Sequence, residues 1–431
     1  MMKNAFMFLA MFMLIVIVGL FQSWTVAFMI INMCIISSIM SLGVNIQWGY
    51  AGLFNLGIMG FVAIGGLATV IISTPPVYEA WEAGGLRIIL ALLFGFFTIV
   101  LATLAWRKLK HSKFRPASIT LILLFGFFIY RYIFDPAVDA IEKINPAVSG
   151  NLGGFGLPII LSWPVGGLFA AGAAWLVGKV SLGLRSDYLA IATLGVSEII
   201  IFIMKNEDWL ARGVKNVIGL PRPVPYEIDL QKSSDFIYWS QTLGIDVVDA
   251  SSLFVKGCYT ILFLIVLLIL YWLCEKALNS PWGRMMRAIR DNEVVAEALG
   301  KNVNSRHLQV FVLGSAVCGV AGAMLVTLDG QLTPTSYHPL RFTFIIWVMV
   351  IVGGSGNNLG SILGGFIIWF FWIEVETIGH FIMDFLTSGF SESNAFRIHM
   401  LNSAAYMRYL TLGLILLLVL RFSPRGLIPE K

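Results

Sequence analysis

The sequence has few charged side chains. Asp, Glu, Lys and Arg together make up 12% of its 431 residues, whereas a soluble domain carries roughly 25%. So few charges cannot cover a surface that faces water, which excludes an ordinary soluble fold. The formal net charge is only +5. We attribute this small basic excess to membrane topology and expect no nucleic-acid partner.

Cysteine is also scarce. The four cysteines all lie in apolar runs, without a CxxC motif or a Cys/His cluster: Cys34, Cys258, Cys274 and Cys318. This arrangement predicts neither a metal site nor a disulfide framework. We expect all four to be small buried hydrophobic residues.

The sequence lacks the motifs of common catalytic sites. It contains no GxxxxGK[ST], HExxH or GxSxG pattern, so it offers no phosphate-binding loop for ATP, no zinc-protease helix and no nucleophile elbow. Nothing assembles a nucleophile, a base and an oxyanion hole. We therefore expect no enzyme activity, no catalytic residues, no metal and no cofactor in this chain. Any ATP hydrolysis would belong to partner subunits.

Apolar residues, by contrast, are abundant. They make up 58% of the chain, which also holds 13 Trp and 42 Gly, as expected for interfacial aromatic belts and closely packed helices in a bilayer. A helical span needs roughly 20 apolar residues. The sequence predicts an all-α, polytopic membrane protein, one domain over 1–431 with ten to twelve transmembrane helices. Candidate spans are 5–22, 25–43, 45–73, 85–105, 117–134, 157–178, 187–204, 253–274, 307–328, 341–354, 359–376 and 405–420.

Basic residues alternate from loop to loop. They concentrate in the loops 106–115 and 276–306, in the link 179–186 and at both termini, and are fewer in the intervening loops. Because Lys and Arg favour the cytoplasmic side, a twelve-span topology with both termini in the cytoplasm is predicted. No small-x-small cleavage site follows the first span, so we expect it to be retained.

Two segments combine glycine with polar residues inside apolar sequence. The first is 45–66, in which the sequence NIQWGYAGLFNLG carries the amides of Asn45, Gln47 and Asn55 among glycines that include Gly49, Gly52 and Gly57. The second is GGSGNNLGSILGG at 353–365. An unwound helix lining a solute pathway explains these features, and so do tightly packed helices joined by hydrogen bonds. Two such segments in opposite halves are also what inverted repeats would produce.

The loop 276–306 predicts a short amphipathic helix. Asp291 or Asn292 can cap its start, Glu293 lies in the first turn, and Gly300 can end it. Arg284, Arg287 and Arg290 flank it. Its apolar face is only one or two turns long, which suits a groove on a cytoplasmic protein better than an interfacial membrane anchor.

Glu198 is the one carboxylate deep within a predicted span. An ionisable residue at membrane depth is a functional candidate. The alternative is a structural carboxylate that hydrogen-bonds a neighbouring helix or faces a polar crevice without touching the solute.

Four runs of sequence resemble the LivM-type permease of branched-chain amino acid ABC importers, a family to which urea-importer permeases are closely related. They are NIQWGYAGLFNLG (45–57), LRSDYLAIATLG (184–195), SPWGRMMRAIRDNEVVAEALGKN (280–302) and RFSPRGLIPE (421–430). The resemblance covers most of the chain in order. The segment 106–156 fits it less clearly.

The resemblance implies a type II-like ABC importer permease in a bacterial inner membrane, surrounded by lipid. It would pair with a second homologous permease, two cytoplasmic ATP-binding subunits and an extracytoplasmic substrate-binding protein. The implied function is ATP-driven import of branched-chain or other hydrophobic amino acids by alternating access. Residues implied to couple to the ATPase are Arg287, Arg290, Glu293, Glu297, Ala298 and Gly300. Residues expected along the translocation path are Asn45, Gln47, Gly49, Gly52, Asn55, Gly57 and Glu198.

Two other functions remain open from the residues. Within the same class, the solute could be urea or a short amide. An ion-coupled secondary transporter belongs to another class and would need paired intramembrane carboxylates, whereas this sequence offers mainly Glu198.

Overall fold

The protein is a helical bundle. The computed structural model describes residues 2–110, 113–146 and 150–430. Over these residues, ten helices are long and apolar enough to cross a membrane, and two shorter apolar helices accompany them. The chain is therefore a multi-pass membrane protein, as predicted.

The long helices follow the predicted spans. They are α1 (Met2–Phe21), α2 (Trp24–Val44), α5 (Leu86–Lys108), α6 (Arg115–Glu142), α7 (Ser162–Ser181), α8 (Ser186–Asn206), α12 (Val247–Asn279), α15 (Val303–Asp329), α17 (Asn358–Leu386) and the pair α18 (Ala395–Ser403) and α19 (Met407–Phe422). The two shorter ones are α3 (Ile58–Ser73) and α16 (Pro339–Gly353).

One predicted span is wrong. The range 45–73 was expected to be a single span, but residues 45–50 continue α2 as the π-helix η1 (Asn45–Tyr50), and α3 begins only at Ile58. Residues 52–57 form no helix. Gly52 explains the interruption, because its φ of +69° lies in the left-handed region that only glycine adopts readily.

The centre of the bundle is formed by α2, α3, α15 and α16, which α7, α12 and α17 cover. In α2 and α15, 72% of the most apolar stretch is buried within the chain. Backbones approach closely where glycines face one another. A Cβ added to Gly65 of α3 would lie 1.9 Å from the carbonyl oxygen of Gly319 in α15. This is the small-residue packing that brings membrane helices together.

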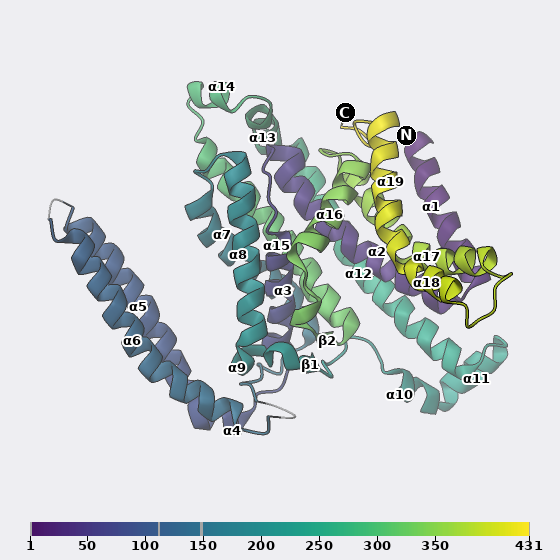
Figure 1. Cartoon of the computed structure of the whole chain (residues 1–431), viewed down its shortest axis with the longest axis horizontal. Helices are drawn as coiled ribbons and strands as arrows, with labels where there is room; N and C mark the ends of the chain where they lie inside the picture. The colour runs from purple at the N-terminus through teal and green to yellow at the C-terminus, as the bar shows by residue number, and fades with distance from the viewer. Residues whose placement is uncertain (1, 111–112, 147–149, 431) are drawn as a thin grey trace.

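Helices α5 and α6 form a hairpin that projects from the bundle (Figure 1). It packs on the rest of the chain at one end, where Ile88, Phe134 and Ile141 belong to one hydrophobic cluster with Trp209 of α9 (Asp208–Ala211). Elsewhere most of its side chains are exposed. The hairpin lies in the segment 106–156 and just before it, the part of the chain that resembled the family least clearly.

The connecting elements lie at the two ends of the bundle. Both termini, α13 (Pro281–Asp291) and α14 (Glu293–Ala298) share one end (Figure 1). At the opposite end, β1 (Val217–Ile218) pairs antiparallel with β2 (Gln331–Leu332), with Val217 opposite Leu332. The basic loop 276–306 and both termini therefore lie at the same end, as the alternation of charge required.

The remaining elements are short. They are α4 (Tyr78–Ala80), η2 (Trp81–Gly85), η3 (Ile159–Leu161), η4 (Gly213–Lys215), α10 (Glu227–Lys232), α11 (Ser234–Thr242), η5 (Pro334–Ser336) and η6 (Ala404–Tyr406).

Candidate functional site

The interruption between α2 and α3, which we call the first break (residues 51–57), is held by side-chain amides. Gln47 donates to the carbonyl oxygen of Phe311 over 2.9 Å and to the hydroxyl of Ser315 over 3.0 Å, both on α15. Asn55 donates to the Gln47 amide oxygen over 2.9 Å and accepts from the N–H of Gly57 over 2.8 Å. Polar groups at membrane depth need partners within the protein. In the unwound backbone, Asn55 satisfies the N–H of Gly57, the Thr193 hydroxyl accepts from the N–H of Leu56, and the Trp347 indole donates to the carbonyl oxygen of Asn55.

A second break separates α16 from α17 at residues 354–357 and touches the start of η1. Asn45 donates to the amide oxygen of Asn358 over 3.0 Å, and the N–H of Gly356 donates to the amide oxygen of Asn45 over 2.8 Å. Tyr50 also donates to Asn358, over 2.5 Å. Asn358 in turn donates to the Glu275 carboxylate over 2.9 Å. The two glycine-rich segments of the sequence are therefore in contact through one buried polar cluster.

The helix predicted in the loop 276–306 is confirmed as α14. The side chain of Asn292 caps it by accepting from the N–H of Val295 over 3.1 Å, and Gly300 follows its end with a φ of +78°. Val294 and Leu299 are each 75% exposed, although both are apolar. The helix stands at the extreme end of the molecule, beyond the bundle (Figure 1).

A preceding helix, α13, was not expected. Ser280 caps it, and it buries Met286 and Ile289 against the bundle. The predicted coupling residues consequently fall into two groups. Those of α14 and its end are exposed, namely Glu293, Glu297, Ala298 and Gly300. Arg287 and Arg290 of α13 instead reach toward the protein.

Arg290 connects three segments of the chain. Its guanidinium donates to the carbonyl oxygen of Gly49 in η1 and forms an ion pair of 2.9 Å with Glu430 in the C-terminal tail. The tail is fixed beside the second break, because the N–H groups of Leu427 and Ile428 each donate over 2.9 Å to the last carbonyls of α16. Arg290 thus links α13 to both breaks.

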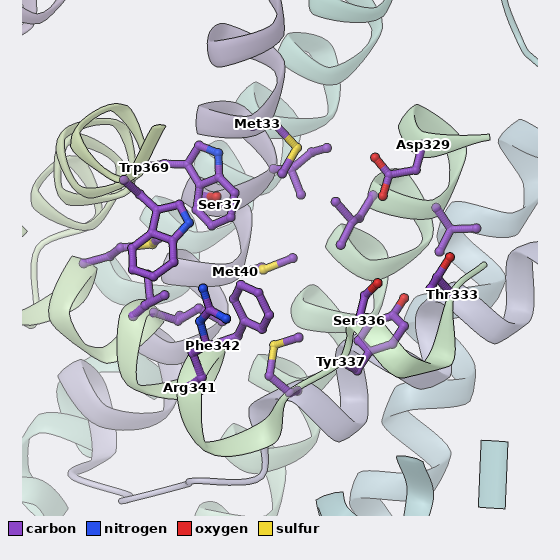
Figure 2. Close-up of a pocket in the computed structure, with 18 of the residues that line it drawn as sticks. Met33, Ser37, Met40, Asp329, Thr333, Ser336, Tyr337, Arg341, Phe342 and Trp369 are labelled. Atoms are coloured by element: carbon purple, nitrogen blue, oxygen red, sulfur yellow. The ribbon is translucent and has the colours of Figure 1, made fainter. Parts of the chain in front are cut away.

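A cavity of about 370 Å³ lies among α2, α15, α16 and α17, and α3, α19 and the segment that contains β2 and η5 complete its wall (Figure 2). Its walls are mainly apolar and include Met33 and Met40. Figure 2 shows Asp329 and Arg341 on opposite sides of it. The segment containing β2 places its rim at the end of the bundle opposite α14 (Figure 1).

Tyr337 forms part of the cavity rim, between η5 and α16. Burial raises the pKa of its phenol above the usual value, and the nearby Asp329 carboxylate raises it further. The hydroxyl therefore stays protonated and remains a hydrogen-bond donor at neutral pH.

Glu198 does not lie in that cavity. It is exposed on α8 and lines a second hollow between α8, α16 and α19, together with Lys205 and His338. Arg341 lines both spaces. The sequence singled out Glu198 but neither Arg341 nor Asp329, because both of these residues stand at helix ends, where charge is common.

Comparison with known proteins identifies the family. Residues 26–152 and 143–420 match the family described as branched-chain amino acid transport system / permease component. A probable branched-chain amino acid transport permease protein LivM of Methanocaldococcus jannaschii is 25% identical over 91% of this chain and 90% of its own length. The LivM permease of Escherichia coli strain K12 is 28% identical over 50% of each chain.

More distant permeases also match. The fructose import permease protein FrcC of Rhizobium meliloti is 26% identical over 28% of this chain and 34% of its own length. No solved structure matches. The family match extends over most of the chain and includes both breaks and α14. The protein therefore belongs to the permease components of the branched-chain amino acid transport system family.

Proposed function

We propose that this chain is one of two homologous permease subunits of an ABC importer in a bacterial inner membrane, with both termini in the cytoplasm. Two ATP-binding subunits dock on it from the cytoplasm, and an extracytoplasmic binding protein delivers the solute. The solute is a branched-chain amino acid, as in the names of the LivM relatives. The exposed apolar face of α14 is the observation that carries the proposal.

The chemistry of α14 fits a protein groove. Val294, Val295 and Leu299 expose apolar surface, while Glu293 and Glu297 are exposed beside them. A helix of only six residues buries too little area for stable binding to a bilayer, because membrane binding scales with buried apolar area. A cytoplasmic subunit that covers this face would gain the apolar burial and reach both carboxylates.

A displacement of α14 can be transmitted directly to the membrane helices through α13. Helices α13 and α14 are joined at Asn292 alone, and Arg290 holds α13 to Gly49 and to Glu430. A displacement of α14 by the ATPase therefore acts on both breaks together. Gly49 and Gly52 belong to the segment that would move.

We infer that the two breaks form the inner end of the translocation path. Asn45, Gln47, Asn55 and Gly57 hold the breaks in the conformation seen here. The bonds from Asn45 to Asn358 and from Gln47 to Ser315 link separate helices. If these amides exchange their partners for others, the breaks can move apart without leaving polar groups unpaired in the membrane. Glu198 lines the hollow between α8, α16 and α19, which adjoins the cavity at Arg341. We assign this hollow to the same path.

The test is uptake of radiolabelled leucine by proteoliposomes that contain both permeases, both ATPases and the binding protein. We expect uptake only with ATP inside and leucine-loaded binding protein outside, and no loss of uptake when the ion gradients are collapsed. Uptake that persists without the ATPases, or that follows an ion gradient, would contradict the proposal. So would labelling from outside of a cysteine placed at Leu299, in a background without the four native cysteines.

A further inference from the structure

The cavity among α2, α15, α16 and α17 is lined by polar groups that have no hydrogen-bond or ion-pair partner within the described protein. The indole N–H of Trp369 is buried without a hydrogen-bond partner. In the described part of the chain, no hydrogen bond from the hydroxyl of Ser37 and no ion pair of Asp329 or Arg341 is present. Buried polar groups in proteins almost always have a partner. At this cavity the buried unpaired group is the Trp369 indole, and it lies with two exposed side chains of opposite charge, Asp329 and Arg341, that form no ion pair. Together they indicate a missing ligand.

Arg341 is presented to this cavity in a fixed position. Its guanidinium lies 5.1 Å from the ring centre of Trp372 and 5.4 Å from that of Tyr409. Aromatic faces hold a guanidinium by cation–π attraction and leave its N–H groups free at the edge. A guanidinium with free N–H groups is well suited to bind a carboxylate through two parallel hydrogen bonds.

The two arginines of the cavity wall differ in whether the protein compensates their charge. Arg408 also lines the cavity, but its guanidinium is paired with the carboxylate of Glu376. Its charge is therefore already compensated by the protein. Of the two cations in the cavity wall, Arg341 is the one available to an anionic group of a ligand.

The apolar wall of the cavity indicates what kind of side chain the ligand carries. Met33, Ser37 and Met40 lie at positions i, i+4 and i+7 of α2, so they share one helix face, and this face lines the cavity. Met59 of α3 and Met349 of α16 add further thioether side chains. Methionine is flexible and polarisable, so such a wall adapts to aliphatic side chains of different shape.

We propose that this cavity binds an α-amino acid with an aliphatic side chain, with its carboxylate on Arg341 and its side chain against the methionines. The Asp329 carboxylate supplies the negative charge that compensates the ammonium group of the ligand. Because Arg341 supplies one uncompensated positive charge and Asp329 one uncompensated negative charge, the cavity favours a zwitterion over a sugar or a simple anion. The inference rests on the proposed function and makes this subunit a substrate-binding one, in addition to any selection by the binding protein.

The experiment is cysteine protection in membranes that contain the whole complex. Ser37→Cys is placed in a background in which Cys34, Cys258, Cys274 and Cys318 are replaced, and it is treated with a small polar thiol reagent from outside. We expect modification, slowed by L-leucine and not by D-ribose. Ser234→Cys on exposed α11 should be modified at a rate that leucine does not change. Met33→Cys replaces Ser37→Cys if that variant does not assemble.

A second substitution tests the carboxylate contact. Adding Arg341→Gln to the Ser37→Cys chain should raise the leucine concentration needed for protection about tenfold to a hundredfold, as for loss of a hydrogen bond to a charged group. Arg87→Gln, an exposed arginine on the α5–α6 hairpin, should leave it unchanged. Absence of protection, or equal protection in both arginine variants, would overturn the binding site. Leucine uptake by the native complex would still test the proposed function separately.

Discussion

The guanidinium of Arg290 in α13 donates a hydrogen bond to the carbonyl oxygen of Gly49, immediately before the first break. The same side chain forms an ion pair with Glu430, whose tail is bonded to the end of α16. A helix at the end of the bundle that carries both termini is thereby connected to the two unwound segments of the membrane domain. Arg290 makes the contact with both segments, and Arg287 of the same helix adds a longer ion pair of 3.8 Å with Glu430.

Removing this charge should weaken coupling. Arg290→Gln loses both its ion pair with Glu430 and the bond to Gly49, whereas Glu430→Gln keeps the Gly49 bond and loses the ion pairs with Arg290 and Arg287. We expect leucine uptake per ATP hydrolysed to fall in both variants, and further in Arg290→Gln. Glu392→Gln, an exposed acid at the opposite end of the bundle, is the control. Equal coupling in Arg290→Gln and the control would remove Arg290 from the transmission.

The polar cluster between the breaks should contribute to stability. Asn358→Ala leaves Asn45, Tyr50 and Glu275 without a partner they have in the native protein. Each buried group left unpaired costs about 1–3 kcal/mol. We expect a clearly lower midpoint of thermal unfolding in detergent. Asn206→Ala, at an exposed position outside the cluster, should change it little. A native-like midpoint for Asn358→Ala would show that the cluster is not stabilising.

The contact between α3 and α15 should not tolerate a methyl group. Gly65→Ala places a Cβ against the carbonyl of Gly319, and overpacking of this kind typically costs about 1–3 kcal/mol. Gly172→Ala is the matched control, since nothing lies within 4 Å of its added Cβ. We expect Gly65→Ala to lower the unfolding midpoint and Gly172→Ala to leave it unchanged or slightly higher. Equal unfolding midpoints in the two variants would show that α3 and α15 accommodate the added methyl group without loss of stability.

Glu198 can be tested without changing its size. If its carboxylate belongs to the path, Glu198→Gln should slow leucine uptake while ATP hydrolysis and the amount of assembled complex stay the same. Glu207→Gln, just beyond the end of the same helix, controls for a general loss of charge. Unchanged uptake kinetics in Glu198→Gln would assign the carboxylate to structure alone.

Much of the fold follows from local sequence. Long apolar runs locate the membrane helices, and Asn292 and Gly300 mark the start and end of α14 through ordinary capping chemistry. The range 45–73 was misassigned, because the residues on both sides of Gly52 are apolar and read as one span. The left-handed backbone at Gly52 starts an unwound stretch that continues to Gly57.

The contacts between distant segments could not be predicted. The glycine and asparagine content of 45–57 and 353–365 indicated two special segments, but nothing in either one shows that Asn45 meets Asn358. The cavity was missed for a similar reason. Ser37, Arg341 and Trp369 stand on three different helices, and their meeting depends on how those helices are rotated. The spacing of Met33, Ser37 and Met40 was the one available signal.

The role of α14 is tested most directly by measuring leucine uptake and ATP hydrolysis together in the reconstituted complex. Leu299→Ser removes apolar surface from α14, and Leu184→Ser removes it from another exposed site, the α7–α8 turn. We predict that the ratio of leucine imported to ATP hydrolysed falls in Leu299→Ser and is native in Leu184→Ser. The same ratio in both variants would contradict docking through α14.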